Sequence, residues 1–144
     1  MHRLRNVFER RNLVTAPPGA SVYDVASTMT AQRVGAIVIV EEGRLVGIFT
    51  ERDLMTRVVV PRRDPERTLV ADVMTREVVT ATLEDHVDFC VDKMRKAGCR
   101  HLPVLSGDRV IGVFSMRDLL GDELEEQDQE IRHLRAYLHQ TPVV

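Results

Sequence analysis

Two octets in this chain are nearly the same, GIFTERDL at Gly47–Leu54 and GVFSMRDL at Gly112–Leu119, 65 residues apart. They share a glycine, a phenylalanine, a hydroxyl residue and a closing Arg-Asp-Leu. The match extends outward without a gap, so that Leu13–Leu54 aligns with Val78–Leu119 and apolar residues face apolar residues. Repetition at a fixed spacing is the signature of a duplicated unit. The chain is therefore a tandem duplication.

Both repeats predict the same order of elements. A short extended segment comes first, at Leu13–Ala16 and at Val78–Thr82, and a helix with apolar residues at helical spacing follows. Two strands rich in Val and Ile come next, with Gly43 or Gly107 in the tight turn between them. A second helix begins after the phenylalanine of each octet. We expect an α/β (α+β) fold of two β-α-β-β-α repeats.

The aligned region also has a lead-in. With one inserted residue, Leu4–Phe8 aligns with Val70–Met74. We expect repeat 1 with a lead-in helix at 1–60, a linker at 61–69, and repeat 2 at 70–120.

Composition excludes several classes of protein. The chain has 144 residues, is 44% hydrophobic and 29% charged, and has a formal net charge of −2, as soluble globular proteins do. That charge argues against a protein that coats nucleic acid or an acidic membrane. No apolar run reaches the ~20 residues of a membrane helix, and the N-terminus lacks a signal-peptide core, so we expect a cytoplasmic protein. Cys90 and Cys99 lack the spacing of a zinc or redox motif and are interpreted as buried thiols.

The octets have two readings that the residues leave open. Thr50 and Ser115 are plausible helix N-caps, with Asp53 and Asp118 three residues later, so each octet is a candidate capping box. The same turn also offers backbone N–H groups, a hydroxyl and a carboxylate, which suit a phosphorylated sugar.

With these features in register, the chain resembles the CBS domain family, whose repeats work in pairs. The resemblance rests on the V-x-D-V-M lead-in at Val70–Met74, the V-V-T start at Val78–Thr80, the element order, the R-H-L-P-V strand at Arg100–Val104, and the two octets. It implies two repeats packed about a pseudo-twofold axis, with two clefts between them. Such clefts commonly bind AMP, ADP, ATP, S-adenosylmethionine or NAD(H).

The resemblance also implies residue roles. Asp53 and Asp118 match the aspartate that holds the ribose hydroxyls, and Thr50 and Ser115 match the hydroxyl residue near ribose or phosphate. The remaining nucleotide-binding candidates are the adenine segment Val14, Thr15 and Ala16 for the Asp118 site, the adenine segment Val78, Val79 and Thr80 for the Asp53 site, the phosphate-binding pair Arg100 and His101, and Arg117.

The two predicted sites differ in charge. The first repeat has Gly35-Ala36 where the second has Arg100-His101, and Glu51 where the second has Met116. A carboxylate beside an anion is unfavourable in a partly desolvated site. We expect the Asp118 site to be the better one for a phosphorylated ligand.

A third element follows the repeats. Gly121-Asp122 is interpreted as a helix stop followed by a cap, and Leu124, Ile131 and Leu138 are seven residues apart, which predicts an amphipathic helix over 121–140. This helix either covers its own module or pairs with a second chain. The resemblance implies disc-shaped homodimers.

These observations favour a regulatory module that senses an adenosine nucleotide, AMP, ADP or ATP, and signals to an unknown effector protein. An NAD(H) or S-adenosylmethionine sensor and a constitutive scaffold with empty clefts are the alternatives. The sequence shows no acid–base–nucleophile constellation and no metal-ligand spacing, so we expect neither an enzyme nor a required cofactor.

Overall fold

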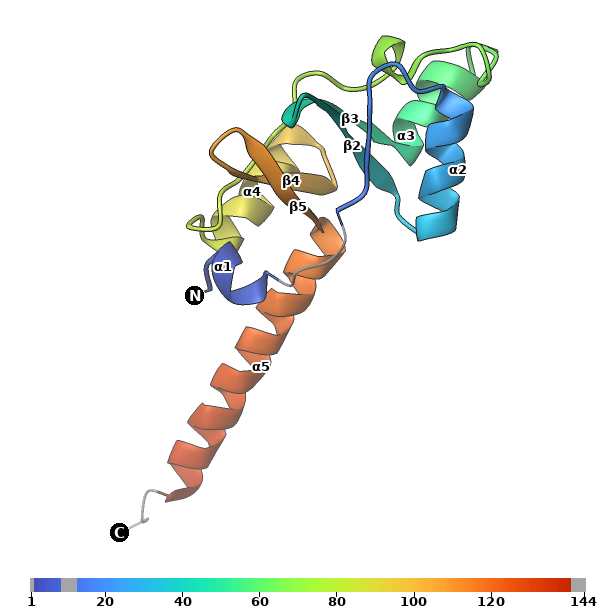
Figure 1. Ribbon diagram of the computed structural model, residues 1–144. Helices are drawn as coiled ribbons and strands as arrows, with labels where there is room; N and C mark the ends of the chain where they lie inside the picture. The colour runs from blue at the N-terminus through green and yellow to red at the C-terminus, as the bar shows by residue number, and fades with distance from the viewer. Residues whose placement is uncertain (1, 9–12, 141–144) are drawn as a thin grey trace.

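The computed structural model describes residues 2–8 and 13–140 of the chain (Figure 1). Its first half contains α1 (Leu4–Val7), β1 (Thr15–Ala16), α2 (Val22–Gln32), β2 (Ala36–Glu41), β3 (Arg44–Thr50), α3 (Glu51–Asp53) and the π-helical stretch η1 (Leu54–Val59). Its second half contains the short helix η2 (Val70–Asp72), α4 (Val87–Ala97), β4 (His101–Ser106), β5 (Arg109–Ser115) and α5 (Met116–Gln140). The order agrees with the predicted fold class.

The duplication is visible in the bounds of the elements. The helices α2 and α4, the strands β2 and β4, and the strands β3 and β5 each begin 65 residues apart. Both hairpins have the same register, with Ala36 opposite Thr50 in one and His101 opposite Ser115 in the other. Both also have an irregularity at the same place, after Ile39 and after Val104. Equivalent sequences therefore build equivalent hairpins, down to the register shift.

The two hairpins meet at equivalent residues. Strand β3 pairs with β5 in antiparallel fashion through Arg44 and Arg109, which are 65 positions apart in the aligned repeats. This contact joins the strands into one sheet of order β1-β2-β3-β5-β4. Because each repeat contributes the same residue to an antiparallel pair, a pseudo-twofold axis passes between them. Figure 1 shows α2 and α3 beside the first hairpin and α4 beside the second.

The lead-in segments are exchanged between the repeats. Leu4, from the chain's start, is fully buried in the second repeat's core, and its backbone N–H donates to the Asp85 carbonyl at 2.8 Å. Val70 and Met74, which precede the second repeat, are buried in the first repeat's core instead. Each repeat therefore completes its core with a segment that the sequence places before the other one. The repeats at 1–60 and 70–120 are therefore units of sequence, and each lead-in packs in the core of the other repeat.

Close contact with the lead-in explains the glycine of each octet. A Cβ on Gly47 would lie 2.4 Å from Met74 Sδ, and a Cβ on Gly112 would lie 2.9 Å from Phe8 Cε2. Phe8 and Met74 are the equivalent last residues of the two aligned lead-ins. The glycine thus leaves room for the lead-in to lie against the strand.

Two predicted boundaries are wrong. Helix α5 runs without interruption from Met116 to Gln140, so Gly121 does not stop it and Asp122 does not begin a new helix. A Cβ on Gly121 would meet no atom within 4 Å, so this glycine lies on an open part of the helix. The predicted strand at Val78–Thr82 is reduced to one parallel bridge, between Ala81 and Val104.

Candidate functional site

Both octets form the predicted capping boxes. In the first, the Asp53 N–H donates to Thr50 Oγ1 at 3.2 Å, and the Thr50 N–H donates to Asp53 Oδ2 at 3.1 Å. In the second, the Asp118 N–H donates to Ser115 Oγ at 3.0 Å, and the Ser115 N–H donates to Asp118 Oδ2 at 3.1 Å. The cap therefore accounts for one carboxylate oxygen of each aspartate. The residues around the two boxes differ.

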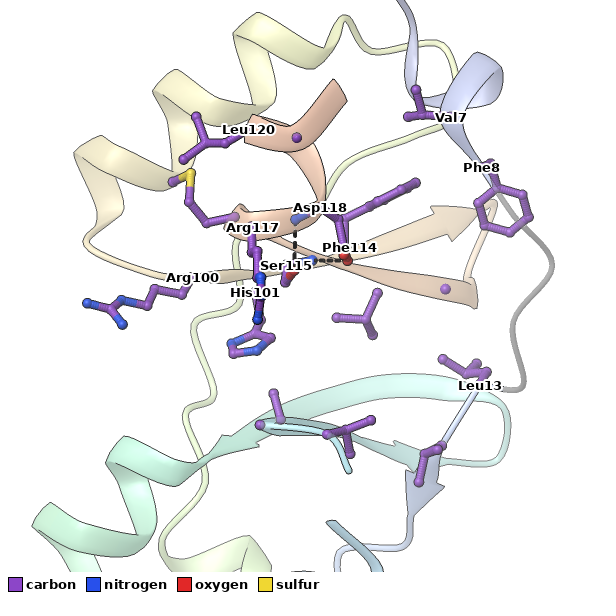
Figure 2. A pocket seen from close by; sticks show the side chains of 18 of the residues that line it. Val7, Phe8, Leu13, Arg100, His101, Phe114, Ser115, Arg117, Asp118 and Leu120 are labelled. Atoms are coloured by element: carbon purple, nitrogen blue, oxygen red, sulfur yellow. Dashed lines mark hydrogen bonds between the residues drawn. The ribbon is translucent and has the colours of Figure 1, made fainter. Parts of the chain in front are cut away.

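A cavity of about 1070 Å³ lies beside the second octet. Figure 2 shows Ser115, Asp118 and Arg117 on one side of this cavity, with Arg100 and His101 close by. The other lining residues come from both repeats and from the lead-in and include Val7, Phe8, Leu13, Val14, Arg33, Val34, Gly35, Ala36, Ile111 and Leu124. Among the described residues, the lining therefore combines apolar walls with the Asp118 carboxylate and several cationic side chains, which suits an organic anion.

His101 connects the two repeats at this cavity. A Cβ on Gly35 would lie 3.5 Å from His101 Nε2 and 3.5 Å from Glu51 Cδ, so the histidine and the first repeat's glutamate approach the same point. Burial lowers the pKa of His101, against an opposing influence of the Glu51 and Asp118 carboxylates, while Arg100 lowers it further. The imidazole is therefore neutral at pH 7 in the free protein. An incoming anion would favour its protonated form.

The first octet has different surroundings. The Thr75 hydroxyl donates to Asp53 at 3.1 Å from Oδ1, and Arg57 Nε lies 3.7 Å from the same oxygen. Arg57 also donates from Nη1 to the carbonyls of Val73 and Met74, at 3.2 and 2.8 Å. Asp53 is only 7% exposed. Its carboxylate holds the second lead-in against the first repeat.

The sequence alone does not indicate Thr75 and Arg57 as partners of Asp53. Neither residue belongs to the octet, and the position that aligns with Arg57 in the second repeat is Asp122. The only available signal is that Arg57 lies four residues after Asp53, a spacing that brings side chains together on a helix. Thr75 could not be identified from the sequence, because only the packing of the exchanged lead-in brings it next to Asp53.

The segments predicted to contact adenine lie in different surroundings. Val14 lines the same cavity as Asp118. Thr15 and Ala16 form strand β1, paired with Val38 and Ile39, and are absent from the cavity's lining. The second segment lies elsewhere: Val79 packs against the second core, and the Thr80 carbonyl accepts a hydrogen bond from Lys93 at 2.8 Å. Val78 is half-buried and is likewise not part of this cavity.

The remaining predicted features are structural. Burial raises the pKa of Cys90 to about 11 and raises that of the half-buried Cys99, as expected of thiols in a core.

Among residues 2–8 and 13–140, no group of three or more His, Cys, Asp and Glu side chains is placed to hold a metal ion. Within the same ranges, no helix is both long enough and apolar enough to cross a lipid bilayer.

The two β-α-β-β-α repeats share one sheet, and a cavity lies beside the second octet. These features define a module built from a tandem pair of domains. The family model of the CBS domain matches the sequence at residues 4–60 and again at residues 70–124. The chain therefore belongs to the CBS domain family and carries two CBS domains in tandem.

Relatives agree with this assignment. The mitochondrial CBS domain-containing protein CBSX3 of Arabidopsis thaliana is 36% identical over 82% of this chain and 60% of its own length. The CBS domain-containing protein YhcV of Bacillus subtilis is 29% identical over 80% of this chain and 81% of its own. The chain thus spans less than two thirds of the length of CBSX3.

Solved structures show the same fold. The CBS domain structure NE2398 superposes with a TM-score of 0.81 at 30% identity, covering 86% of this chain and 99% of its own. The CBS domain protein PAE2072 of Pyrobaculum aerophilum, solved in complex with AMP, superposes with a TM-score of 0.74 at 28% identity, covering 81% and 88%.

Proposed function

We propose that this protein is a regulatory module that binds an adenosine nucleotide in the Asp118 cavity and signals through a change of conformation or assembly. The observation that carries the proposal is the cavity's lining, which places a carboxylate beside Arg100, Arg117 and His101. The AMP complex of the similar protein PAE2072 supports the choice of ligand class.

The chemistry of the lining suits a nucleotide. The Asp118 carboxylate can accept hydrogen bonds from two ribose hydroxyls, and Arg100 and His101 can meet phosphate oxygens with charge-assisted bonds. Val14 and the other apolar residues can cover the faces of a base. A phosphate-bearing ligand fits these cations better than the sulfonium of S-adenosylmethionine, because like charges repel.

The Asp53 site is the weaker candidate. Its carboxylate already accepts hydrogen bonds from the Thr50 N–H and the Thr75 hydroxyl, lies 3.7 Å from Arg57 Nε, and is only 7% exposed. A ribose would have to displace the Thr75 hydroxyl before it could bind there. We therefore propose one principal nucleotide site, at Asp118.

A thermal-shift panel with AMP, ADP, ATP, NAD, NADH and S-adenosylmethionine tests the proposal. A ligand at 100 times its Kd raises the free energy of unfolding by about 2.7 kcal/mol. For a domain of this size the melting temperature should then rise by about 10 °C. The panel is run on the wild type, on Asp118→Asn and on the matched variant Asp53→Asn.

The expected result is a shift with at least one phosphate-bearing nucleotide, lost in Asp118→Asn and kept in Asp53→Asn. Asparagine keeps a cap acceptor but removes the charge that strengthens the ribose bonds. No shift with any compound would favour a constitutive scaffold. Loss of the shift only in Asp53→Asn would place the ligand in the other site.

A further inference from the structure

The second half of α5 extends away from the module that carries it (Figure 1). Its first turns pack on α4, with Leu119 fully buried. Beyond them, five large apolar side chains are each about half or more exposed: Leu124, Ile131, Leu134, Tyr137 and Leu138, at 48–70%. Leu124 still lines the Asp118 cavity, but the alternative that this helix covers its own module does not hold for Ile131, Leu134, Tyr137 and Leu138.

Four of these side chains form a continuous stripe. At 3.6 residues per turn, Leu124, Ile131, Leu134 and Leu138 fall within about a quarter of the helix circumference. Leu120, which packs against the second core, lies on the same side. The stripe that begins on the module therefore continues past its edge. Because most helix stability comes from packing of such a face, an exposed stripe of this length indicates a partner.

Charge along the helix indicates which partner fits. From Leu124 to Glu130 the charged residues are the acids Glu125, Glu126, Asp128 and Glu130. From Ile131 to His139 they are Arg132, His133, Arg135 and His139, with no acid among them. A second copy of this helix in the parallel direction would place acid beside acid, whereas the antiparallel direction places each acidic half beside a basic half.

We propose that the distal part of α5 pairs with α5 of a second copy of this chain in the antiparallel direction. Placing Ile131 opposite Leu134 of the other copy brings these two residues of each stripe together at the centre of the pair. Gln127 then lies opposite Leu138, and Asp128 lies near Arg135 of the other copy. Asp128 already forms an ion pair with Arg132 of its own helix at 2.9 Å, so Arg135 adds a second cation. The two modules lie at opposite ends of the pair.

The register is tested with single cysteines. Gln127→Cys and Leu138→Cys are each made in a Cys99→Ser background, which leaves only the buried Cys90 as a native thiol. The two full-length variants are mixed, oxidised mildly and compared with each variant alone. The antiparallel pair brings residue 127 of one copy to residue 138 of the other. The mixture should give a covalent dimer, and each variant alone at least tenfold less.

Matched substitutions separate the stripe from the rest of the helix. Ile131→Asp, added to both cysteine variants, should abolish the cross-link, while Gln129→Asp adds the same charge on the opposite side of α5 and should keep it. Melting of the module should be unchanged in both, since these residues lie beyond its core. Efficient cross-linking within each variant alone would show a parallel pair and overturn the proposal. The absence of any cross-link would also overturn the proposal, even if the native protein has the mass of a dimer in solution. This test involves no nucleotide and is therefore independent of the proposed function.

Discussion

Thr75 donates its hydroxyl to the carboxylate of Asp53, at 3.1 Å from Oδ1 and 3.3 Å from Oδ2. The two residues belong to different repeats in the sequence, since Thr75 follows the lead-in of the second repeat and Asp53 closes the first octet. The bond therefore fastens the exchanged lead-in to the first repeat. It also makes the two octet aspartates unequal: Asp53 is buried and holds its own chain, whereas the half-buried Asp118 lines a cavity.

Removing this hydroxyl should destabilise the fold. Thr75→Val keeps the side-chain shape but deprives the buried Asp53 carboxylate of a donor, and hydrogen bonds to charged groups contribute about 1.5–3 kcal/mol. We expect urea unfolding to show a loss of that order. The control is Thr56→Val, which removes an exposed hydroxyl that donates to the Arg52 carbonyl four residues earlier. Equal stability of the Thr75→Val protein and the wild type would mean that the bond has no structural role.

Replacing the glycine of either octet with alanine should lower the free energy of unfolding. Gly47→Ala places a methyl group 2.4 Å from Met74 Sδ and 3.0 Å from the Thr75 carbonyl oxygen. Because the second contact is backbone, a shift of the Met74 side chain cannot relieve it fully. Overpacking of this kind lowers the free energy of unfolding by about 1–3 kcal/mol. Gly112→Ala, whose three nearest contacts are all with the Phe8 side chain, should lower it less.

Gly19→Ala is the matched control for that series. No atom lies within 4 Å of its added methyl group. The substitution should leave stability unchanged or raise it by up to about 1 kcal/mol, because alanine restricts the unfolded chain. Chemical denaturation of the three variants gives the ranking. A Gly47→Ala protein as stable as Gly19→Ala would contradict the close packing of the lead-in.

The repeats and their capping boxes could be predicted from the sequence, because each depends on local pattern. The hairpins follow from apolar runs around Gly43 and Gly107, which have positive φ of 79° and 60°. Exchange of the lead-ins could not be predicted. A lead-in such as Leu4–Phe8 carries the same apolar pattern whichever core it enters, and only three-dimensional packing decides between them.

The uninterrupted helix α5 was missed for an energetic reason. A glycine inside a helix is unfavourable by about 1 kcal/mol relative to alanine, which made Gly121 look like a terminus. The residues on both sides, however, are mostly good helix formers such as Leu, Glu, Gln and Arg. Their summed preference over 25 residues exceeds the penalty at one position. A single glycine is therefore weak evidence for a helix end when no proline or change of pattern accompanies it.

The cysteines should react slowly in the native protein. Burial raises the pKa of Cys90 to about 11 and also raises that of Cys99, and the thiolate is the reactive form. At pH 8, a disulfide reagent such as dithionitrobenzoate should modify Cys99 slowly and Cys90 only after unfolding in urea. The Cys99→Ser variant assigns the two phases. Rapid native labelling of Cys90 would show that its part of the core opens readily.

Nucleotide binding should be accompanied by proton uptake at His101. Burial lowers the pKa of this imidazole, so it is neutral in the free protein at pH 7, while the same residue in an unfolded chain has a pKa of about 6.5. A phosphate beside it raises the pKa, because the negative charge favours the imidazolium. Affinity for a phosphorylated ligand should therefore increase as the pH falls from 7 toward 6. The free protein should lose stability over the same range, because its unfolded state binds the proton more readily.

Calorimetric titration at pH 6.5 in two buffers of different ionisation enthalpy measures this uptake directly. The wild type should take up a fraction of a proton for each nucleotide bound. His101→Gln should remove the uptake, and His86→Gln, at an exposed position before α4, should retain it. The protonated imidazole would then lie near Glu51 and Asp118 as well as the phosphate, since these carboxylates already act on His101 in the free protein. Uptake that persists in His101→Gln would assign the proton to another group, and its absence from the wild type would place the phosphate away from His101.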